Sequence, residues 1–80
     1  MFITYDPAKR IDTMVRRALD MKDVDQVFSG PCMTFEDTRQ DYGEVRLITI
    51  GFLGGRMVWV AWTERDETRR IISLRKANDR

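Results

Sequence analysis

Residues 46–53 read RLITIGFL, residues 56–65 read RMVWVAWTER, and residues 69–76 read RRIISLRK. All three runs are rich in β-branched and aromatic residues, which favour the half-buried surface of a sheet. Gly54 and Gly55 separate the first two runs and predict a tight hairpin, because glycine readily takes the positive φ of a two-residue turn. This turn would pair Leu53 with Arg56, so the three runs predict an antiparallel meander.

The residues before the meander predict one more strand at each end of a helical region. Residues 2–5 favour a short strand, and Asp6-Pro7 is a typical start for a helix. The helix expected over residues 8–20 has one apolar stripe, and a second helix is expected over 22–28 before Ser29-Gly30-Pro31. The stripe is formed by Ile11, Met14, Val15, Ala18 and Leu19. With a further strand over 32–38, the sequence predicts an α+β fold in one domain, residues 1–80.

Strand alternation divides the meander into two faces, which predicts where the helices and a ligand would lie. One face is purely apolar, and we expect it to carry the helices; it contains Ile48, Ile50, Phe52, Met57, Trp59 and Ala61. The other face mixes apolar and basic groups and is the expected ligand surface; it contains Val58, Val60, Trp62 and Glu64, with Arg69 and Arg75. A slip of one residue in the last strand would exchange its two sets of side chains.

Charge is unevenly distributed along the chain, although the net charge is only +1. Residues 20–44 contain two basic and seven acidic side chains, whereas residues 65–80 contain six basic and three acidic ones. This basic C-terminal part predicts an anionic ligand, while the alternative is an ordinary solvated surface. No apolar run is long enough for a membrane helix, and Cys32 has no second cysteine to pair with, so we expect a cytoplasmic protein.

The absence of histidine excludes several kinds of active site. A Ser-His-Asp or Cys-His nucleophile cannot be built, nor can a Cys/His zinc site. The acidic residues Glu36, Asp37 and Asp41 could bind Mg²⁺, but a polar turn carries such residues in any case. The sequence therefore predicts neither a metal nor a cofactor.

Five motifs, in order along nearly the whole chain, resemble the BrnT toxins of bacterial type II toxin–antitoxin systems. They are Tyr5–Lys9, Phe35–Asp37 with Asp41–Glu44, Ile50–Arg56, Thr63–Arg65 and Arg70–Ala77. The resemblance implies a RelE-like fold, in which two helices cover one face of a small, largely antiparallel sheet. It also implies an endoribonuclease that inhibits translation. One departure is that members usually carry Lys-His-Gly between the first two helices, whereas this chain reads RRALD at residues 16–20.

The same resemblance implies a protein partner. The expected antitoxin is of the BrnA type, a ribbon–helix–helix protein that neutralises the toxin. Its dimerisation would give a heterotetramer, and promoter DNA would be bound only through the antitoxin. No membrane partner is expected.

Metal-free cleavage by attack of a 2′-OH on the adjacent phosphate requires a base, positive charge and a means of holding the strand in line. Arg65 and Arg75 are our candidates for the phosphate clamp, because the guanidinium fork matches phosphate oxygens. Glu64 is the candidate base, although it could simply pair with an arginine. The candidates for RNA binding are Lys9, Arg69, Lys76 and, by stacking on a base, Trp62.

For Trp62 the alternative to stacking on a base is packing beneath the sheet edge or against the antitoxin. For the protein as a whole, two alternatives to a nuclease follow from the same residues. A non-catalytic RNA- or DNA-binding module would use the same arginines without poised catalytic geometry. A regulatory interaction protein would account for a two-faced sheet on a small core.

Overall fold

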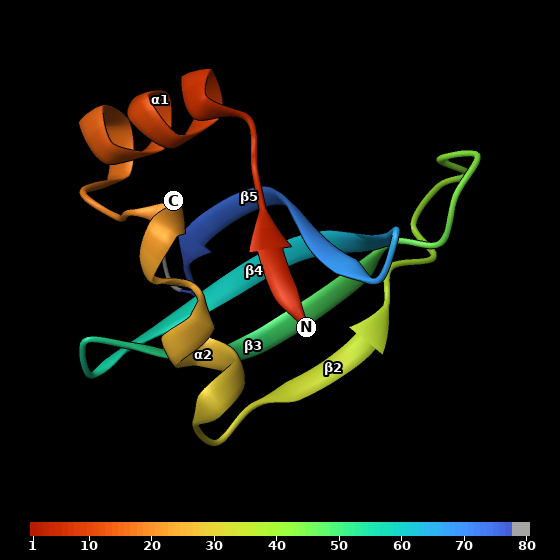
Figure 1. Ribbon diagram of the computed structural model, residues 1–80. Coiled ribbons are helices and arrows are strands. Elements are labelled where there is room, and N and C mark those ends of the chain that lie inside the picture. The colour runs from red at the N-terminus through yellow and green to blue at the C-terminus, as the bar shows by residue number, and fades with distance from the viewer. Residues whose placement is uncertain (78–80) are drawn as a thin grey trace.

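A five-stranded mixed sheet organises residues 1–77, the part of the chain described by the computed structural model (Figure 1). Two helices and one 3₁₀ turn complete the α+β fold, as predicted. The elements in chain order are β1 (Phe2–Thr4), α1 (Pro7–Arg17), η1 (Met21–Asp23), α2 (Asp25–Ser29), β2 (Met33–Glu36), β3 (Leu47–Leu53), β4 (Arg56–Arg65) and β5 (Thr68–Lys76).

The sheet has the strand order β1-β5-β4-β3-β2. Strands β2 to β5 form an antiparallel meander, and β1 pairs in parallel with the first three residues of β5. The predicted hairpin register between β3 and β4 is confirmed, with Leu53 opposite Arg56 and Ile50 opposite Trp59. Gly54 and Gly55 take φ angles of 59° and 78°, which allow the tight turn.

Strand β5 contains a β-bulge that the sequence did not reveal. Ala61 faces Ser73, but the next residue of β4, Trp62, faces Ile71, so Ile72 is an extra residue in β5. A bulge breaks the alternation of side chains along its strand. As a result Ile71 and Leu74, three residues apart, are both buried on the same face of the sheet.

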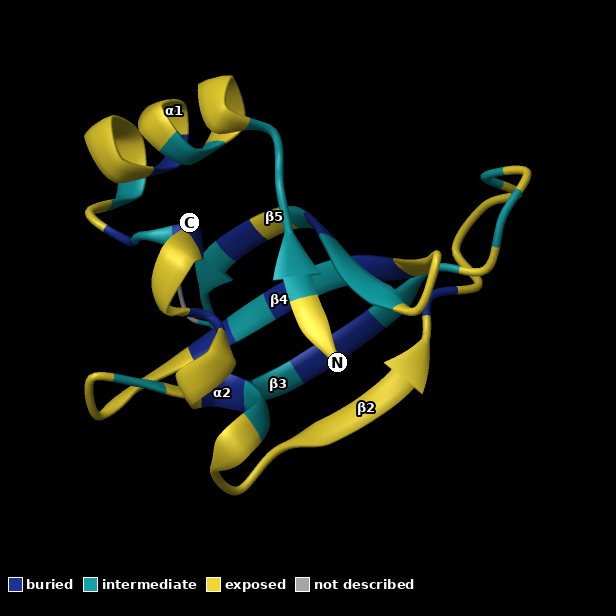
Figure 2. Ribbon diagram, viewed as in Figure 1, coloured by how far each residue is buried: buried dark blue, intermediate teal, exposed yellow. Residues whose placement is uncertain are grey.

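The core lies on the face that we expected to be the ligand surface, so the predicted assignment of the two faces was wrong (Figure 2). Residues of η1 and α2 pack there against β4 and β5, whereas Phe52 and Met57 of the opposite face are each 45% exposed. Both faces are apolar enough to be buried, so alternation alone could not choose between them. The core cluster comprises Leu19, Met21, Val24, Val27, Val58, Val60, Trp62, Ile71 and Leu74.

Gly51 provides the physical reason for the side that α2 covers. A Cβ atom placed on Gly51 would lie only 2.7 Å from Cγ1 of Val27 in α2 and 3.1 Å from Cβ of Cys32. The helix can therefore approach β3 this closely only because position 51 has no side chain. A glycine inside a strand can mark such a close approach, but this signal was missed from the sequence.

Helix α1 has most of its apolar stripe turned outward, contrary to the prediction that the stripe is buried. Ile11, Met14, Val15 and Ala18 are exposed, and only Leu19, beyond the end of the helix, lies in the core. Asp6 caps the helix by accepting a hydrogen bond from the N–H of Ala8, and the helix ends where Ala18 takes φ 56°. The side chain that α1 buries is Thr13, while Ile11 is 62% exposed and Val15 80% exposed. Helical periodicity identifies an apolar stripe but not the surface that covers it.

Candidate nucleic-acid interface

The sheet surface opposite α2 is called the open face here, and it is built from regular rows of side chains across the strands. Its rows follow from the strand registers: Phe35, Ile48, Ala61 and Ser73 form one row, and Met33, Ile50, Trp59 and Arg75 form the next. Thr63 faces Arg70 in a third row. The open face is therefore apolar near its centre and has arginine side chains on β5.

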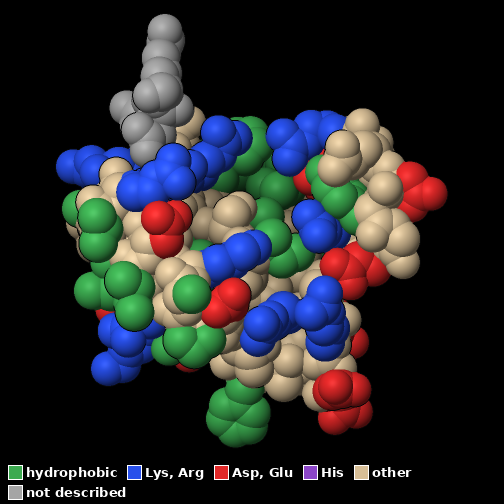
Figure 3. All heavy atoms as spheres, turned by 90° about the horizontal axis from the view of Figure 1, so that it is seen from above, with side chains coloured by type: hydrophobic (Ala, Val, Ile, Leu, Met, Phe, Trp, Pro, Cys, Tyr) green, Lys and Arg blue, Asp and Glu red, His purple; other side chains and the backbone are tan. Residues whose placement is uncertain are grey.

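Six cationic side chains line two depressions beside this surface, and together they are called the basic rim: Lys9, Arg39, Arg46, Arg65, Arg70 and Arg75. One depression, of about 130 Å³, has Arg39 and Arg75 on its wall; the other, of about 160 Å³, has the remaining four. The two are neighbours, because Ser73 lines the first and Ile72 the second. Figure 3 shows Lys and Arg side chains around a hollow whose floor is hydrophobic.

The basic rim is fixed in part by one carboxylate, Glu44. Its Oε1 lies 3.2 Å from Nη2 of Arg65, and its Oε2 lies 3.5 Å from Nε of Arg46. The guanidinium of Arg46 also stacks over the ring of Tyr42, with Cζ 4.2 Å from the ring centroid. Glu44 thus links the end of β4 to the start of β3 and holds two arginines side by side.

A second carboxylate, Asp37, holds Arg39 at the edge of the first depression. Oδ1 and Oδ2 of Asp37 accept hydrogen bonds of 2.9 and 2.8 Å from the Arg39 guanidinium, and Oδ2 also accepts one from the Tyr42 hydroxyl. The bonds from Arg39 are the main reason that the pKa of Asp37 lies well below its ordinary value. Asp37 is therefore an ion-pair partner that stays charged in acid, and it positions Arg39.

The structure divides the seven site residues expected from the sequence between the two sides of the sheet. Lys9, Arg65 and Arg75 belong to the basic rim. The other four lie on the helix-covered side by register: Trp62 and Glu64 by alternation along β4, Arg69 opposite Glu64, and Lys76 opposite Val58. Arg69 and Arg75, expected on one face, are thus separated by the bulge.

Trp62 occupies the core and has a structural role there. It is 6% exposed, its indole N–H donates a 2.9 Å hydrogen bond to Oγ1 of Thr49, and Phe28 meets its ring edge-on. Arg69 covers this pair from outside, with Cζ 4.0 Å from the Phe28 centroid and 5.4 Å from the Trp62 centroid. This geometry favours the packing alternative for Trp62 over stacking on a base.

Four residues beside the open face were missed as site residues: Arg39, Arg46, Arg70 and Trp59. Trp59 was expected in the core because its face was expected to carry the helices. Strand alternation places Arg46 and Arg70 on the open face. They could have been predicted if the bulge and the identity of the buried face had been known. Arg39 follows β2 in a loop, where no periodic signal places a side chain.

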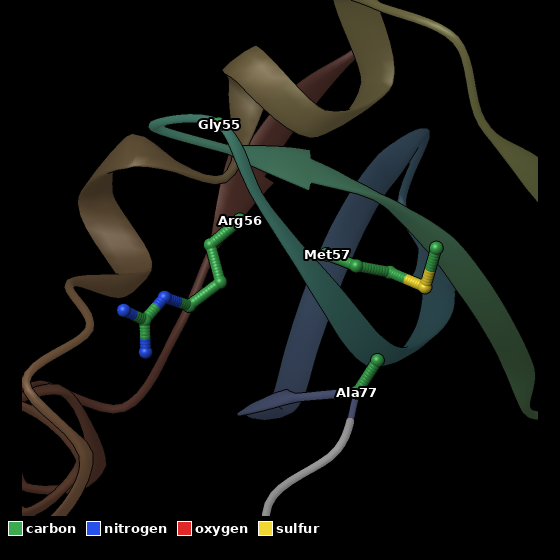
Figure 4. A pocket seen from close by; sticks show the side chains of 4 residues that line it. All are labelled: Gly55, Arg56, Met57 and Ala77. Atoms are coloured by element: carbon green, nitrogen blue, oxygen red, sulfur yellow. The ribbon is translucent and has the colours of Figure 1, made fainter.

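A further depression, of about 520 Å³, lies at the β3–β4 hairpin and is lined by Gly55, Arg56, Met57 and Ala77 (Figure 4). Arg56 and Met57 point to opposite sides of β4, and Arg56 is the one charged side chain among the four. Within residues 1–77, no three His, Cys, Asp or Glu side chains come together as a metal site. The described helices are also too short and polar to cross a membrane.

The comparison with protein families gives a match over most of the chain. A family model described as "Ribonuclease toxin, BrnT, of type II toxin-antitoxin system" matches residues 5–80. No curated protein matches the chain significantly.

Proposed function

This chain belongs to the BrnT family of ribonuclease toxins of type II toxin–antitoxin systems, and we propose that it cleaves RNA at the basic rim of its open face. The observation that carries this proposal is the convergence of six cations beside an apolar sheet surface. Phosphate contacts supply most of the affinity for a nucleic acid, and apolar or aromatic surface next to them suits unpaired bases.

Arg65 and Arg75 act as the phosphate clamp in this proposal. They come from the neighbouring strands β4 and β5 and line two separate depressions. Arg75 lies opposite Trp59, six residues along β4 from Arg65, so the two arginines would contact different phosphates of one strand. Guanidinium groups bind phosphate oxygens bidentately and stabilise the negative charge that develops during 2′-OH attack. Lys9, Arg46 and Arg70 hold the strand on either side, and none of these steps needs a metal ion.

Two carboxylates compete for the role of general base. Glu64, the candidate from the sequence, follows Thr63 in β4 and by alternation points away from the open face. Glu44 contacts Arg65 directly and is about a quarter exposed, with 28% of its side chain accessible. We therefore add Glu44 as a second candidate, and comparing Glu44→Gln with Glu64→Gln decides between them by the loss of cleavage.

The family implies an antitoxin partner, and we propose a ribbon–helix–helix protein of the BrnA type, which neutralises the toxin and inhibits its effect on translation. Its dimerisation would give a heterotetramer that binds promoter DNA through the antitoxin. The outward stripe of α1 supports a protein partner, because an apolar surface on a helix is a common docking site. Figure 3 shows hydrophobic side chains gathered on that side of the molecule.

The test is induced expression in a bacterium that lacks the partner gene, followed by primer extension on cellular RNA. We expect growth arrest and new 5′ ends in transcripts from the wild-type chain, and neither from Arg75→Ala. Arg56→Ala is the matched control, because Arg56 is an exposed arginine at the far hairpin. Full growth with intact transcripts on wild-type expression would sink the proposal.

Assays of the purified protein distinguish a nuclease from a non-catalytic RNA-binding module. If the wild-type chain binds RNA but leaves it intact, the protein is a binding module and not a nuclease. If it cuts RNA in a large excess of chelator, the metal-free mechanism stands. If chelation abolishes cleavage and added Mg²⁺ restores it, that part of the proposal is wrong.

A further inference from the structure

The two tryptophans of the chain occupy opposite environments, although they are only three residues apart in β4. Trp62 is buried and hydrogen-bonded, whereas Trp59 is half-buried on the open face. In the sheet register Trp59 lies between Ile50 of β3 and Arg75 of β5. It is therefore an aromatic ring next to the basic rim.

The surroundings of Trp59 form a small site around its ring. The ring helps to line the depression of about 130 Å³, together with Ile48, Ala61 and Ser73. Phe35 meets it at 90° with a centroid distance of 6.4 Å, and the Cζ atom of Arg75 lies 5.0 Å from its centroid. One side of the ring thus contacts another aromatic ring, while the cationic side chain of Arg75 covers it from β5.

We propose that Trp59 is the stacking platform for one unpaired nucleobase of a single-stranded RNA. The choice of RNA, and not another nucleic acid, rests on the proposed function. Stacking on an aromatic ring tolerates any base, since each base has a π-face, and it is generally stronger than an exposed cation–π contact. The base would therefore replace Arg75 on the ring, which leaves the guanidinium of Arg75 to bind the adjacent phosphate.

This exchange links base binding to the phosphate clamp. With no RNA present, Arg75 rests on Trp59; with a base on the ring, Arg75 faces the backbone from which that base projects. Bases in a duplex are already stacked on their neighbours and cannot reach the ring without being extruded. Trp59 is accordingly a positioning residue that selects single strands, and it leaves bond cleavage to other groups.

Tryptophan fluorescence tests the proposal directly, because the chain has only two tryptophans. The probe is a 2′-O-methyl RNA oligonucleotide, which has no free 2′-OH to attack the phosphate. Titration of the wild-type chain with the single strand should quench its emission, and Trp59→Phe should lose this quenching while Trp62 still emits. The blunt duplex of the same sequence should give little quenching at equal concentration.

Affinity supplies a second measurement that does not depend on which tryptophan emits. Trp59→Ala should weaken binding of the single strand by about tenfold or more, and Trp59→Phe by much less, because a phenyl ring still stacks. Met57→Ala, on the same face and 45% exposed, is the control and should bind like the wild type. Thermal denaturation of all three variants shows whether each one is folded.

The results distinguish this inference from the proposed function. Quenching by the single strand that depends on Trp59, without any cleavage of unmodified RNA, supports the stacking site and contradicts the nuclease. Cleavage of RNA by a folded Trp59→Ala variant with wild-type rate and affinity overturns the stacking site and leaves the nuclease intact. Equal quenching by single strand and duplex also overturns it.

Discussion

The two faces of strand β4 have nearly the same hydrophobicity and opposite surroundings. Val58 and Val60 are completely buried under η1 and α2, while Met57 and Trp59 lie on the open face, where Arg75 covers the ring of Trp59. The difference comes from outside the strand, since Gly51 lets α2 approach one side and the basic rim occupies the other. Apolar residues in a sheet therefore indicate burial on one face and can indicate a binding surface on the other.

The largest expected effect is on stability. It is tested by comparing the loss of a buried side chain with the loss of a side chain on the open face. Leu74→Ala removes a side chain that is 1% exposed and should lower the free energy of unfolding by about 2–5 kcal/mol. Met57→Ala on the open face should change it by about 0.5 kcal/mol or less. Urea denaturation followed by circular dichroism measures both; equal losses would show that the two faces are not distinguished as described.

The next largest effect is on the rate of RNA cleavage. It is tested by substituting two arginines of β5 that lie on opposite sides of the sheet. Arg75→Ala should lower the cleavage rate by roughly 10²-fold, the usual cost of removing one group that stabilises transition-state charge. Arg69→Ala should change the rate by only a few-fold, because Arg69 stacks on Phe28 at the helix-covered side. Single-turnover cleavage of a labelled RNA measures the rates.

Arg69→Ala also loses a stacking contact on the core, so its thermal stability must be measured in parallel. A folded Arg69→Ala variant with as large a loss of rate as Arg75→Ala would contradict the assignment of the basic rim. Lys in place of Arg75 keeps the charge and loses the bidentate fork, so partial activity of Arg75→Lys would show that geometry matters.

A third effect concerns α1, whose outward stripe contrasts with the buried stripe of an ordinary amphipathic helix. Val15→Glu puts a charge at an 80% exposed position and should leave folding and RNA cleavage unchanged. It should weaken binding of the antitoxin by about tenfold, if that helix face is covered in the complex. Co-purification and calorimetry with the antitoxin measure this, with Asp12→Ala on the flank of the stripe as the control.

The smallest effect is pH-dependent and concerns the ion pair between Arg10 and Asp20. A 2.7 Å hydrogen bond from Arg10 is the main cause that lowers the pKa of Asp20 from 3.8 to about 2. The folded state therefore favours the charged carboxylate, and this stabilisation is present above about pH 4 and lost as the pH falls toward 2. Asp20→Asn should be less stable than the wild type at pH 6, and the difference should disappear near pH 2.

Thermal denaturation of both proteins across this range checks the prediction. A difference that stays constant from pH 6 to pH 2 would mean that Asp20 acts through packing or the turn at Lys22, and not through its charge. Asp20 also accepts a hydrogen bond from the backbone N–H of Lys22, which asparagine can still accept. Comparison with Asp20→Ala separates that contact from the ion pair.

Local rules predicted most of the fold. The Gly54-Gly55 turn gave the register of β3 with β4, and the Asp6-Pro7 start of α1 followed from capping. Which face is buried could not be predicted, because it depends on a tertiary contact between α2 and Gly51. The direction of the α1 stripe likewise depends on how the helix lies on β5.

The candidate site was predicted less completely than the fold, for a related reason. Arg65 and Arg75 were found because they occur in strands and in motifs shared with the family. Arg39 and Glu44 lie in the connection between β2 and β3, where positions are set by ion pairs formed only in the folded chain. Trp59 was expected in the core because the prediction assigned the helices to the wrong face of the sheet.

The bulge in β5 has a genetic consequence. Ile72 is the extra residue of β5, while Leu74 lies in the core and Arg75 on the open face. An in-frame deletion of this one codon would leave a regular strand in which Ile71 and Leu74 still face the core and Arg75 still faces the open side, because the deleted residue has no partner in β4. Loss of codon 72 should therefore be better tolerated than loss of a paired codon such as 74, which removes a side chain of the core.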